Sequence, residues 1–189
     1  MRLFIIAFVL LFCSSAFALD QQEESILAGL SNCITKQCKS DETRVYALME
    51  FVHDRVKPKE GEDPYKQISD LERIQTGVGW CNHQAKIFMH LAYYQEIKTR
   101  LIYLMNDDGT ASPHTIAEWW NGKEWIIADP LFMIYGISRE EIRQSVGWDD
   151  IPYSFFRQKF PLIKDRPDEW LRCYINEPQI IFEYNPLPN

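Results

Sequence analysis

The sequence predicts an α+β protein in which helices come first and an antiparallel sheet follows. Two patterns with helical spacing lie between residues 40 and 97, and three strand-like runs follow between residues 99 and 128. The last two runs flank Asn121-Gly122, a pair that is typical of tight hairpin turns because both residues accept positive φ. Helices that precede a group of adjacent antiparallel strands are the pattern of the α+β class.

The first of the two helices is predicted over residues 40–56. Ser40 is a suitable N-cap, and the acidic residues at 41 and 42 suit the positive end of a helix. The apolar residues that follow repeat at helical spacing: Val45, Leu48, Met49 and Val52. Residues 57–77 show no clear periodicity, and they are predicted to form a long loop or a pair of short turns.

The second helix is predicted over residues 80–97. One face collects the residues Ala85, Phe88, Leu91, Ala92 and Gln95. Strands are then predicted at 99–105, 114–120 and 123–128, with a turn at 106–109. Ser138 is predicted to cap a further helix, and residues 179–184 to form one more strand. No repeat or linker divides the chain.

The N-terminus has the pattern of a secretory signal peptide. Arg2 precedes ten unbroken apolar residues, and small residues end at Ala18. Ten residues fall short of the roughly 20 that a spanning helix needs, so an uncleaved anchor is the weaker alternative. We therefore expect an exported protein, periplasmic or secreted, with a signal peptide at 1–18 and one domain at 19–189.

The charge and the cysteines set further limits. The formal net charge is −7, and removal of residues 1–18 with their one Arg makes it −8. An acidic chain without a basic cluster argues against nucleic acid and anionic membrane surfaces as partners.

Export would expose the mature cysteines to an oxidising compartment. A local disulfide between Cys33 and Cys38 is one pairing, and a bridge from either of them to Cys173 is the other.

Cys81 is the candidate nucleophile. It follows Gly77 and Gly79, which let the chain turn and present the thiol at a helix N-terminus, where the helix dipole favours thiolate. The alternative is a small buried apolar residue, as most free cysteines are. If the hairpin turns at Asn121-Gly122, His114 lies directly opposite Asp129, close enough for the carboxylate to hold the imidazole. A nucleophile, a base and an orienting group are then present together.

The histidines near Cys81 and the tryptophans near the hairpin give weaker indications of function. His83 and His90 are seven residues apart on one helix, about 10.5 Å, which is too far to share one ion. We expect neither a metal site nor a cofactor. The tryptophans around the hairpin either fill hydrophobic space or line a cleft for a peptide-like substrate. The candidate substrate contacts are Trp80, Trp119 and Trp120.

The motifs GVGWC, HTIAEWW and IIADP, in this order, resemble the transglutaminase-like superfamily. The resemblance covers about residues 40–136 and includes VYALMEFVHDRV, which is similar to the helix that precedes the family's nucleophile. It implies a papain-like core in which the catalytic helix packs on an antiparallel sheet. It also implies that Cys81 is the nucleophile, His114 the base and acid, and Asp129 the orienting residue. The extension at 137–189 has no counterpart in the resemblance.

Some features of the wider family do not transfer. Animal transglutaminases use calcium and additional β-domains, and this sequence indicates neither. Gln75 stands six residues before Cys81, a spacing similar to that of the oxyanion glutamine in papain-like proteases, although a surface glutamine is the alternative. The backbone amide of Cys81 is the other candidate donor to an oxyanion.

These observations predict an exported cysteine enzyme that attacks an amide or peptide bond and forms a thioester. Hydrolysis is expected in preference to acyl transfer to an amine, because water is always available. The expected partner is a peptide or protein substrate, such as a cell-wall peptide, and the oligomeric state is open. The alternative from a different class is an inactive transglutaminase-like module that binds peptide or cell-wall fragments.

Overall fold

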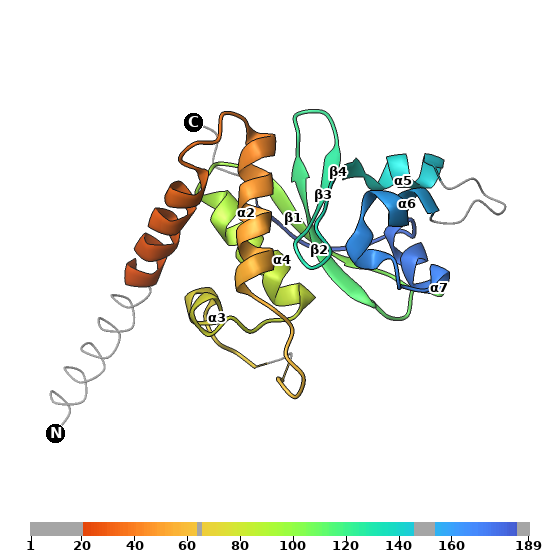
Figure 1. The fold of residues 1–189 in the computed structure, drawn as a ribbon, viewed down its shortest axis with the longest axis horizontal. Coiled ribbons are helices and arrows are strands. Elements are labelled where there is room, and N and C mark those ends of the chain that lie inside the picture. Colours follow the sequence, from red (N-terminus) through yellow and green to blue (C-terminus); the bar gives the residue numbers. More distant parts are fainter. Residues whose placement is uncertain (1–20, 64–65, 146–153, 185–189) are drawn as a thin grey trace, which may run out of the picture.

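The structure is a computed structural model that describes residues 21–63, 66–145 and 154–184. The predicted signal peptide lies outside these residues. The described chain has an antiparallel sheet with the strand order β4-β3-β2-β1-β5. The strands are β1 (Thr99–Leu104), β2 (His114–Trp120), β3 (Trp125–Asp129), β4 (Ile134–Ser138) and β5 (Gln179–Tyr184). With its helices on either side of this sheet, the protein is α+β, as the sequence predicts (Figure 1).

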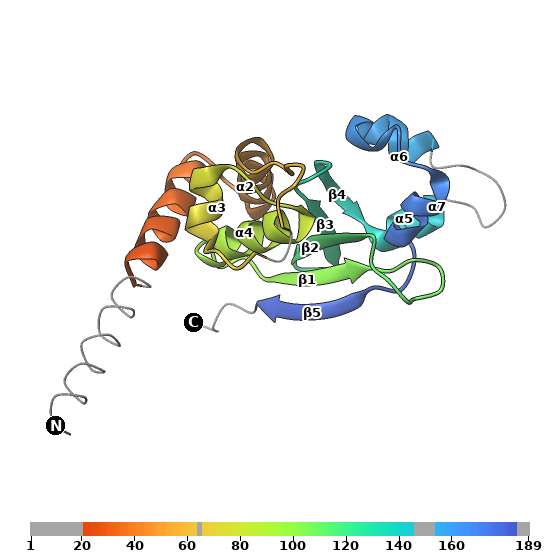
Figure 2. The ribbon, with the colours of Figure 1, turned by 90° about the horizontal axis from the view of Figure 1, so that it is seen from below.

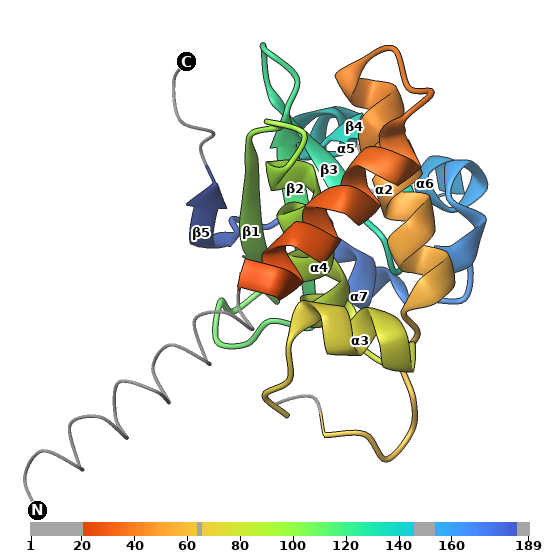
Figure 3. The same ribbon diagram turned by 90° about the vertical axis from the view of Figure 1, so that its left-hand side faces the viewer.

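The N-terminal helices cover one face of the sheet. Residues 21–35 are helical, and they are followed by α2 (Asp41–Arg55), α3 (Asp70–Thr76) and α4 (Cys81–Tyr93). Helix α4 packs on β1 and β2, and α2 packs on α4, so α4 lies closest to the sheet (Figure 3). None of the helices in the described ranges is long and apolar enough for a membrane crossing.

The predicted start of α2 is confirmed in detail. The Ser40 hydroxyl accepts a hydrogen bond from the Thr43 amide at 3.3 Å, and the Thr43 hydroxyl accepts one from the Ser40 amide at 3.1 Å. This reciprocal capping box satisfies two backbone donors that a helix start would otherwise leave unpaired. The helix ends at Arg55, one residue before the predicted limit.

Helix α3 lies inside the segment that the sequence predicts as loop or turns, so that prediction was wrong for residues 70–76. The Ser69 hydroxyl caps it by accepting the Glu72 amide at 3.1 Å. Gly77 ends it with a left-handed φ of 73°, and its amide donates to the Arg73 carbonyl. A serine cap and a terminal glycine were visible signals, but seven residues give too few apolar repeats for a periodicity to be recognised.

Helix α4 ends at Tyr93, four residues before the predicted limit at 97. Glu96 has a φ of 58°, a left-handed conformation that a helix cannot continue through. The Ile97 amide reaches back to the Ala92 carbonyl at 3.1 Å and closes the end of the helix. The chain then enters β1 at Thr99.

Two hydrophobic cores lie on the two faces of the sheet. The first lies beneath the N-terminal helices and includes Leu48, Phe88, Leu91, Ala117 and Ala128. The second lies on the opposite face and includes Ile116, Ile127, Phe132, Leu171 and Tyr174. Residues after β4 supply much of the second core, so the C-terminal extension packs on this face of the sheet.

The extension consists of short elements followed by the edge strand β5. The elements are α5 (Arg139–Ser145), α6 (Ser154–Lys159), η1 (Pro161–Ile163), α7 (Asp168–Leu171) and η2 (Arg172–Tyr174). Ser138 caps α5 as predicted, because its hydroxyl accepts the Glu141 amide at 3.1 Å. The predicted strand at 179–184 is confirmed as β5, which pairs with β1 (Figure 2). Strand β4 was not predicted.

Candidate active site

Cys81 is the first residue of α4, and glycines in the preceding loop bring it there. Gly77 and Gly79 pair with the end of α2: the Lys57 amide donates to the Gly77 carbonyl and the Gly79 amide to the Lys57 carbonyl, both at 3.0 Å. A Cβ on Gly79 would lie 2.7 Å from Cγ1 of Val56, closer than two carbon atoms can approach. The loop before Cys81 can therefore pack against α2 only with glycine at position 79.

The start of α4 is fixed by a histidine. His83 is buried, and its Nδ1 accepts a hydrogen bond from the Trp80 amide at 3.1 Å. The imidazole thus takes the role that a glutamate has in the third helical position of a capping box. The sequence did not predict this capping role of His83. The amides of Cys81 and Asn82 have no helical carbonyl before them to accept a bond and point toward the end that carries Cys81, whereas the His83 amide donates to the Trp80 carbonyl at 3.0 Å.

The hairpin that carries His114 and Asp129 has a different register from the predicted one. Trp120 pairs with Trp125, and the ladder continues to Ala117 opposite Ala128. The turn is centred on Gly122-Lys123: the Asn121 amide donates to the Glu124 carbonyl at 3.2 Å. The prediction that His114 lies directly opposite Asp129 was therefore wrong.

His114 and Asp129 still lie on the same face of the sheet, because the observed register differs from the predicted one by two residues. Side chains alternate along a strand, so a shift by two leaves each of them on the same face. Continuing the observed ladder sets Asp129 opposite Ile116, and His114 becomes its diagonal neighbour on that face. Diagonal neighbours on one face remain within reach of long side chains.

His114 and Asp129 are joined by a buried hydrogen bond. Nε2 of His114 donates to Oδ2 of Asp129 at 2.8 Å, and both side chains are almost fully buried. An ionised carboxylate only accepts, so this contact places a proton on Nε2. The other ring nitrogen, Nδ1, is then left for the thiol of Cys81, with which His114 also shares a hydrogen bond.

The surroundings of Cys81 favour its thiolate form. Burial alone would raise the pKa of the Cys81 thiol, but the hydrogen bond and the positive charge of His114 outweigh it, and the pKa falls below its ordinary value. The backbone amide of Thr115 also donates to the sulfur and lowers the pKa further. Cys81 is therefore a pKa-shifted thiol in a half-buried position, the condition that nucleophilic cysteines require.

The pKa of His114 moves in the opposite direction. Burial would lower it, but the negative charge of Asp129, the hydrogen bond to that carboxylate and the contact with Cys81 raise the pKa to about 9. A lowered thiol pKa and a raised imidazole pKa together favour the thiolate–imidazolium ion pair near neutral pH. The arrangement combines a nucleophile with a proton donor for a leaving group.

Residues from two other segments surround the imidazole of His114. The ring centroid of Phe132 lies 5.3 Å from that of His114, and the Trp170 ring lies at 5.4 Å. The carboxylate of Asp129 accepts a further hydrogen bond from the Tyr174 hydroxyl at 2.6 Å. Trp170 and Tyr174 were missed by the sequence analysis, because the resemblance ended near residue 136 and nothing in the sequence assigns residue 174 a position beside residue 129.

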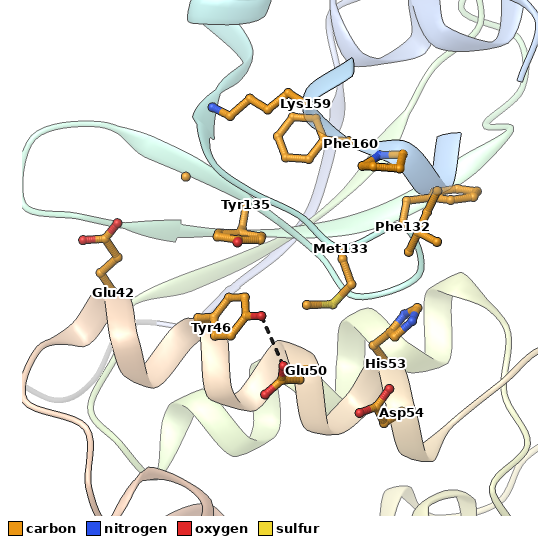
Figure 4. A pocket seen from close by; sticks show the side chains of 13 residues that line it. Glu42, Tyr46, Glu50, His53, Asp54, Phe132, Met133, Tyr135, Lys159 and Phe160 are labelled. Atoms are coloured by element: carbon orange, nitrogen blue, oxygen red, sulfur yellow. Dashed lines mark hydrogen bonds between the residues drawn. The ribbon is translucent and has the colours of Figure 1, made fainter. Parts of the chain in front are cut away.

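A hollow of about 570 Å³ lies beside this site, between α2, the β3–β4 connection and the segment around η1. Figure 4 shows His53 and Phe132 near one end of it and Glu42 toward the other. Tyr46 and Tyr135 meet edge to face within it, with ring centroids 4.8 Å apart. Phe132 lines the hollow and also contacts His114, so the hollow borders the candidate site.

Comparison with known families agrees with the geometry. The family model of the transglutaminase-like superfamily matches residues 28–130, which is 103 of the 189 residues and includes Cys81, His114 and Asp129. The chain belongs to the transglutaminase-like superfamily. The match ends one residue after Asp129, so Trp170 and Tyr174 lie outside the part that defines this membership.

Other comparisons add little to this transglutaminase-like assignment. A solved structure from Cytophaga hutchinsonii, described as that of a candidate cysteine protease, is similar to the chain with 19% sequence identity and a TM-score of 0.48. The similarity covers 59% of this chain and 38% of that one, so this chain corresponds to well under half the length of that protein. No curated protein matches the chain.

The other predicted site residues of this transglutaminase-like chain lie in different places. Trp80 precedes Cys81, is half-buried, and donates from Nε1 to the Glu62 carbonyl at 3.3 Å. Gln75 is exposed on α3, where its backbone carbonyl accepts a hydrogen bond from Arg55. The proposed role of the Gln75 side chain as an oxyanion donor stays a prediction.

The hairpin tryptophans do not lie at the triad. Trp119 is buried in the core beneath the N-terminal helices. Trp120 lies at the opposite end of β2 from His114, six residues or about 20 Å away along an extended strand. Trp120 packs edge to face on Trp125, with ring centroids 5.5 Å apart. Trp119 thus fills the core and Trp120 braces the hairpin, and the roles of Trp80, Trp119 and Trp120 as substrate contacts stay a prediction.

The other cysteines in the described part of the chain carry free thiols. Cys33 is exposed, and Cys38 is half-buried with its thiol donating to the Thr43 carbonyl at 3.4 Å. The disulfide between Cys33 and Cys38 stays a prediction. Cys173 is buried, and burial together with the nearby charge of Asp129 raises its thiol pKa well above the ordinary range.

Within the described ranges, no three His, Cys, Asp or Glu side chains are grouped so as to hold a metal ion.

Proposed function

We propose that this chain is a cysteine enzyme that attacks an amide or peptide carbonyl through Cys81. The observation that carries the proposal is the chain of contacts from the Cys81 thiol through His114 to Asp129, with the thiol pKa lowered and the imidazole pKa raised to about 9. Structural cysteines in apolar surroundings have the opposite shift, as Cys173 does.

The reaction follows from the positions of these groups. The Cys81 thiolate attacks the carbonyl carbon, and the backbone amide at the start of α4 donates to the oxyanion that develops. The His114 imidazolium then gives its proton to the leaving nitrogen as the carbon–nitrogen bond breaks, which leaves a thioester on Cys81. Asp129 holds the imidazole in orientation and stabilises its charge throughout.

The thioester is resolved by the same residues in reverse. Neutral His114 removes a proton from water, the hydroxide attacks the thioester carbon, and the carbon–sulfur bond breaks to return the thiolate. A primary amine in place of water would give acyl transfer. We propose hydrolysis as the main reaction and a peptide or protein, such as a cell-wall peptide, as the substrate.

We also propose that the protein is exported to the periplasm or beyond the cell through the segment at 1–18. The support is the sequence pattern of that segment. An extracytoplasmic enzyme would meet cell-wall peptides directly. Comparison of the intact mass of the protein in extracytoplasmic and cytoplasmic fractions tests this part, and a full-length cytoplasmic product would refute it.

The test of the reaction is direct observation of the thioester. The purified protein is mixed with a panel of glutamine-containing and cell-wall peptides, with and without an added primary amine, and its intact mass is followed. We expect an acyl adduct in the wild type and in Cys33→Ser, a control at an exposed thiol, and none in Cys81→Ala. An inactive binding module would instead form no adduct with any peptide, while Cys81→Ala would bind those peptides as tightly as the wild type.

A further inference from the structure

Tyr174 belongs to the C-terminal extension, outside the part of the chain that matches the family. It ends η2 and is completely buried in the second core. Its ring centroid lies 6.1 Å from that of His114 and 5.9 Å from that of Trp170. A phenylalanine would fill this space equally well, so the packing alone does not explain a hydroxyl here.

The hydroxyl of Tyr174 contacts the Asp129 carboxylate of the candidate triad. It donates to Oδ2 of Asp129 at 2.6 Å, and the same oxygen accepts the His114 ring nitrogen at 2.8 Å. The other oxygen, Oδ1, accepts the backbone amides of Leu131 at 3.0 Å and Phe132 at 3.4 Å. All four contacts come from fixed donors, so the carboxylate is held in one orientation.

We propose that Tyr174 is a positioning residue for the triad, which fixes the Asp129 carboxylate and moderates its hold on the His114 imidazolium. Oδ2 is shared between two donors, so its negative charge is divided between the phenol and the imidazole. Removal of the phenol leaves His114 as the one side-chain donor to Oδ2 among the described contacts. The Asp129 carboxylate then holds the His114 imidazolium more strongly. The carboxylate itself is less firmly oriented, because it has lost one of its donors.

The direction of the hydrogen bond supports this role. Burial and the charge of Asp129 raise the pKa of the Tyr174 hydroxyl well above its ordinary value. The phenol therefore stays protonated at every pH at which the protein would work, and it remains a donor while His114 gains and loses its proton. A neutral donor stabilises the carboxylate without adding a competing positive charge.

The role of Tyr174 rests on the function proposed for Cys81, but its test needs no substrate. The rate of alkylation of Cys81 by iodoacetamide is measured from pH 5 to pH 10 by intact mass, and the C2 proton of His114 is titrated by NMR. In Tyr174→Phe we expect the upper inflection of the alkylation profile and the His114 pKa to rise by about 0.5 unit or more, as loss of one charge-assisted hydrogen bond to the carboxylate would give.

The matched control is Tyr94→Phe. It also removes a phenol that donates to a carboxylate, that of Glu24, but at the C-cap of α4, the end of the helix opposite Cys81. A Tyr174→Phe profile that coincides with that of Tyr94→Phe would overturn the proposal and leave Tyr174 as a packing residue. If Tyr174→Phe does not fold, 3-fluorotyrosine at position 174 replaces it. This more acidic phenol is a stronger donor and should move the His114 pKa downward, and an unchanged value would also overturn the proposal.

The two proposals can fail separately. A shifted alkylation profile without a thioester on any peptide would support the role of Tyr174 and refute the enzyme reading. A thioester on Cys81 together with an unshifted alkylation profile would support the enzyme function and refute the role of Tyr174.

Discussion

Nδ1 of His53 donates to the carbonyl of Pro130 at 2.7 Å, which ties helix α2 to the residue directly after Asp129. A carbonyl oxygen only accepts, so the proton of this contact lies on Nδ1. Asp129 thus begins a connection that is fixed on one side by α2 and on the other by its own bonds to the amides of Leu131 and Phe132. The orientation of the carboxylate depends on both.

Replacement of His53 should loosen this connection. In His53→Ala the Pro130 carbonyl loses its partner, and we expect the free energy of unfolding to fall by about 1–2 kcal/mol. Alkylation of Cys81 at neutral pH should slow in parallel. Urea denaturation measures the first effect and intact mass the second. Asp54→Ala changes the exposed neighbour on the same helix, and equal effects from the two substitutions would contradict the role of His53.

Gly79 should not tolerate a side chain. The added Cβ of Gly79→Ala would lie 2.7 Å from Val56 and 3.1 Å from His83, the residue that caps α4. We expect a loss of about 1–3 kcal/mol in the free energy of unfolding, as overpacking of a filled site gives, together with slower alkylation of Cys81.

Gly29→Ala is the matched control. Gly29 lies on an exposed helical position with no atom within 4 Å of the added Cβ. The same substitution there should stabilise the protein by about 0.5–1 kcal/mol, because alanine favours helix over glycine. Thermal unfolding of the two variants in one buffer compares their stabilities. A stable Gly79→Ala protein with unchanged thiol reactivity would show that the close approach of Gly79 to Val56 is unimportant.

His114 should make the stability of the protein depend on pH. Its pKa is raised from 6.5 to about 9 in the folded protein. A histidine with a raised pKa adds stability that is fully present below its unfolded value of about 6.5 and is lost as pH rises through about 9. The free energy of unfolding from urea titrations at pH 6, 7.5 and 9.5 should therefore fall more steeply in the wild type than in His114→Gln. Parallel curves for the two proteins would contradict the shift.

The thiols should differ sharply in reactivity at pH 6. An ordinary cysteine with a pKa of about 8.5 is then ionised to well under 1%, roughly 0.3%. Cys81, with its lowered pKa, should react with iodoacetamide faster than the exposed Cys33, and the buried Cys173 should not react in the folded protein. Peptide mapping after a short exposure identifies the modified residue. Preferential labelling of Cys33 would speak against an activated Cys81.

The candidate triad could be predicted because its members are set by short local signals. A glycine pair before Cys81 and a hairpin between His114 and Asp129 are both properties of a few neighbouring residues. The turn itself was misplaced, because Asn121 uses its side-chain oxygen to accept the amides of Lys123 and Glu124, at 2.8 Å each. The prediction of a shared face survived because the error was an even number of residues.

Contacts between distant segments could not be predicted in this way. The bond from Tyr174 to Asp129 spans 45 residues, and that from His53 to Pro130 spans 77. Neither residue carries a local pattern that names its partner, since a buried tyrosine and a helical histidine have many possible neighbours. The family resemblance did not help with Tyr174, because it ended well before it.

The position of Tyr174 in the chain has a consequence for biosynthesis. A ribosome that has translated the family-matched region has already incorporated Cys81, His114 and Asp129, but it has still to translate Tyr174, which donates to the Asp129 carboxylate. A nascent or prematurely terminated chain would therefore hold every reacting group without the donor that aligns them. On the role proposed for Tyr174, the thiol reaches its final reactivity only when the C-terminal segment is present and docked, so the chemistry of the protein depends on a complete chain.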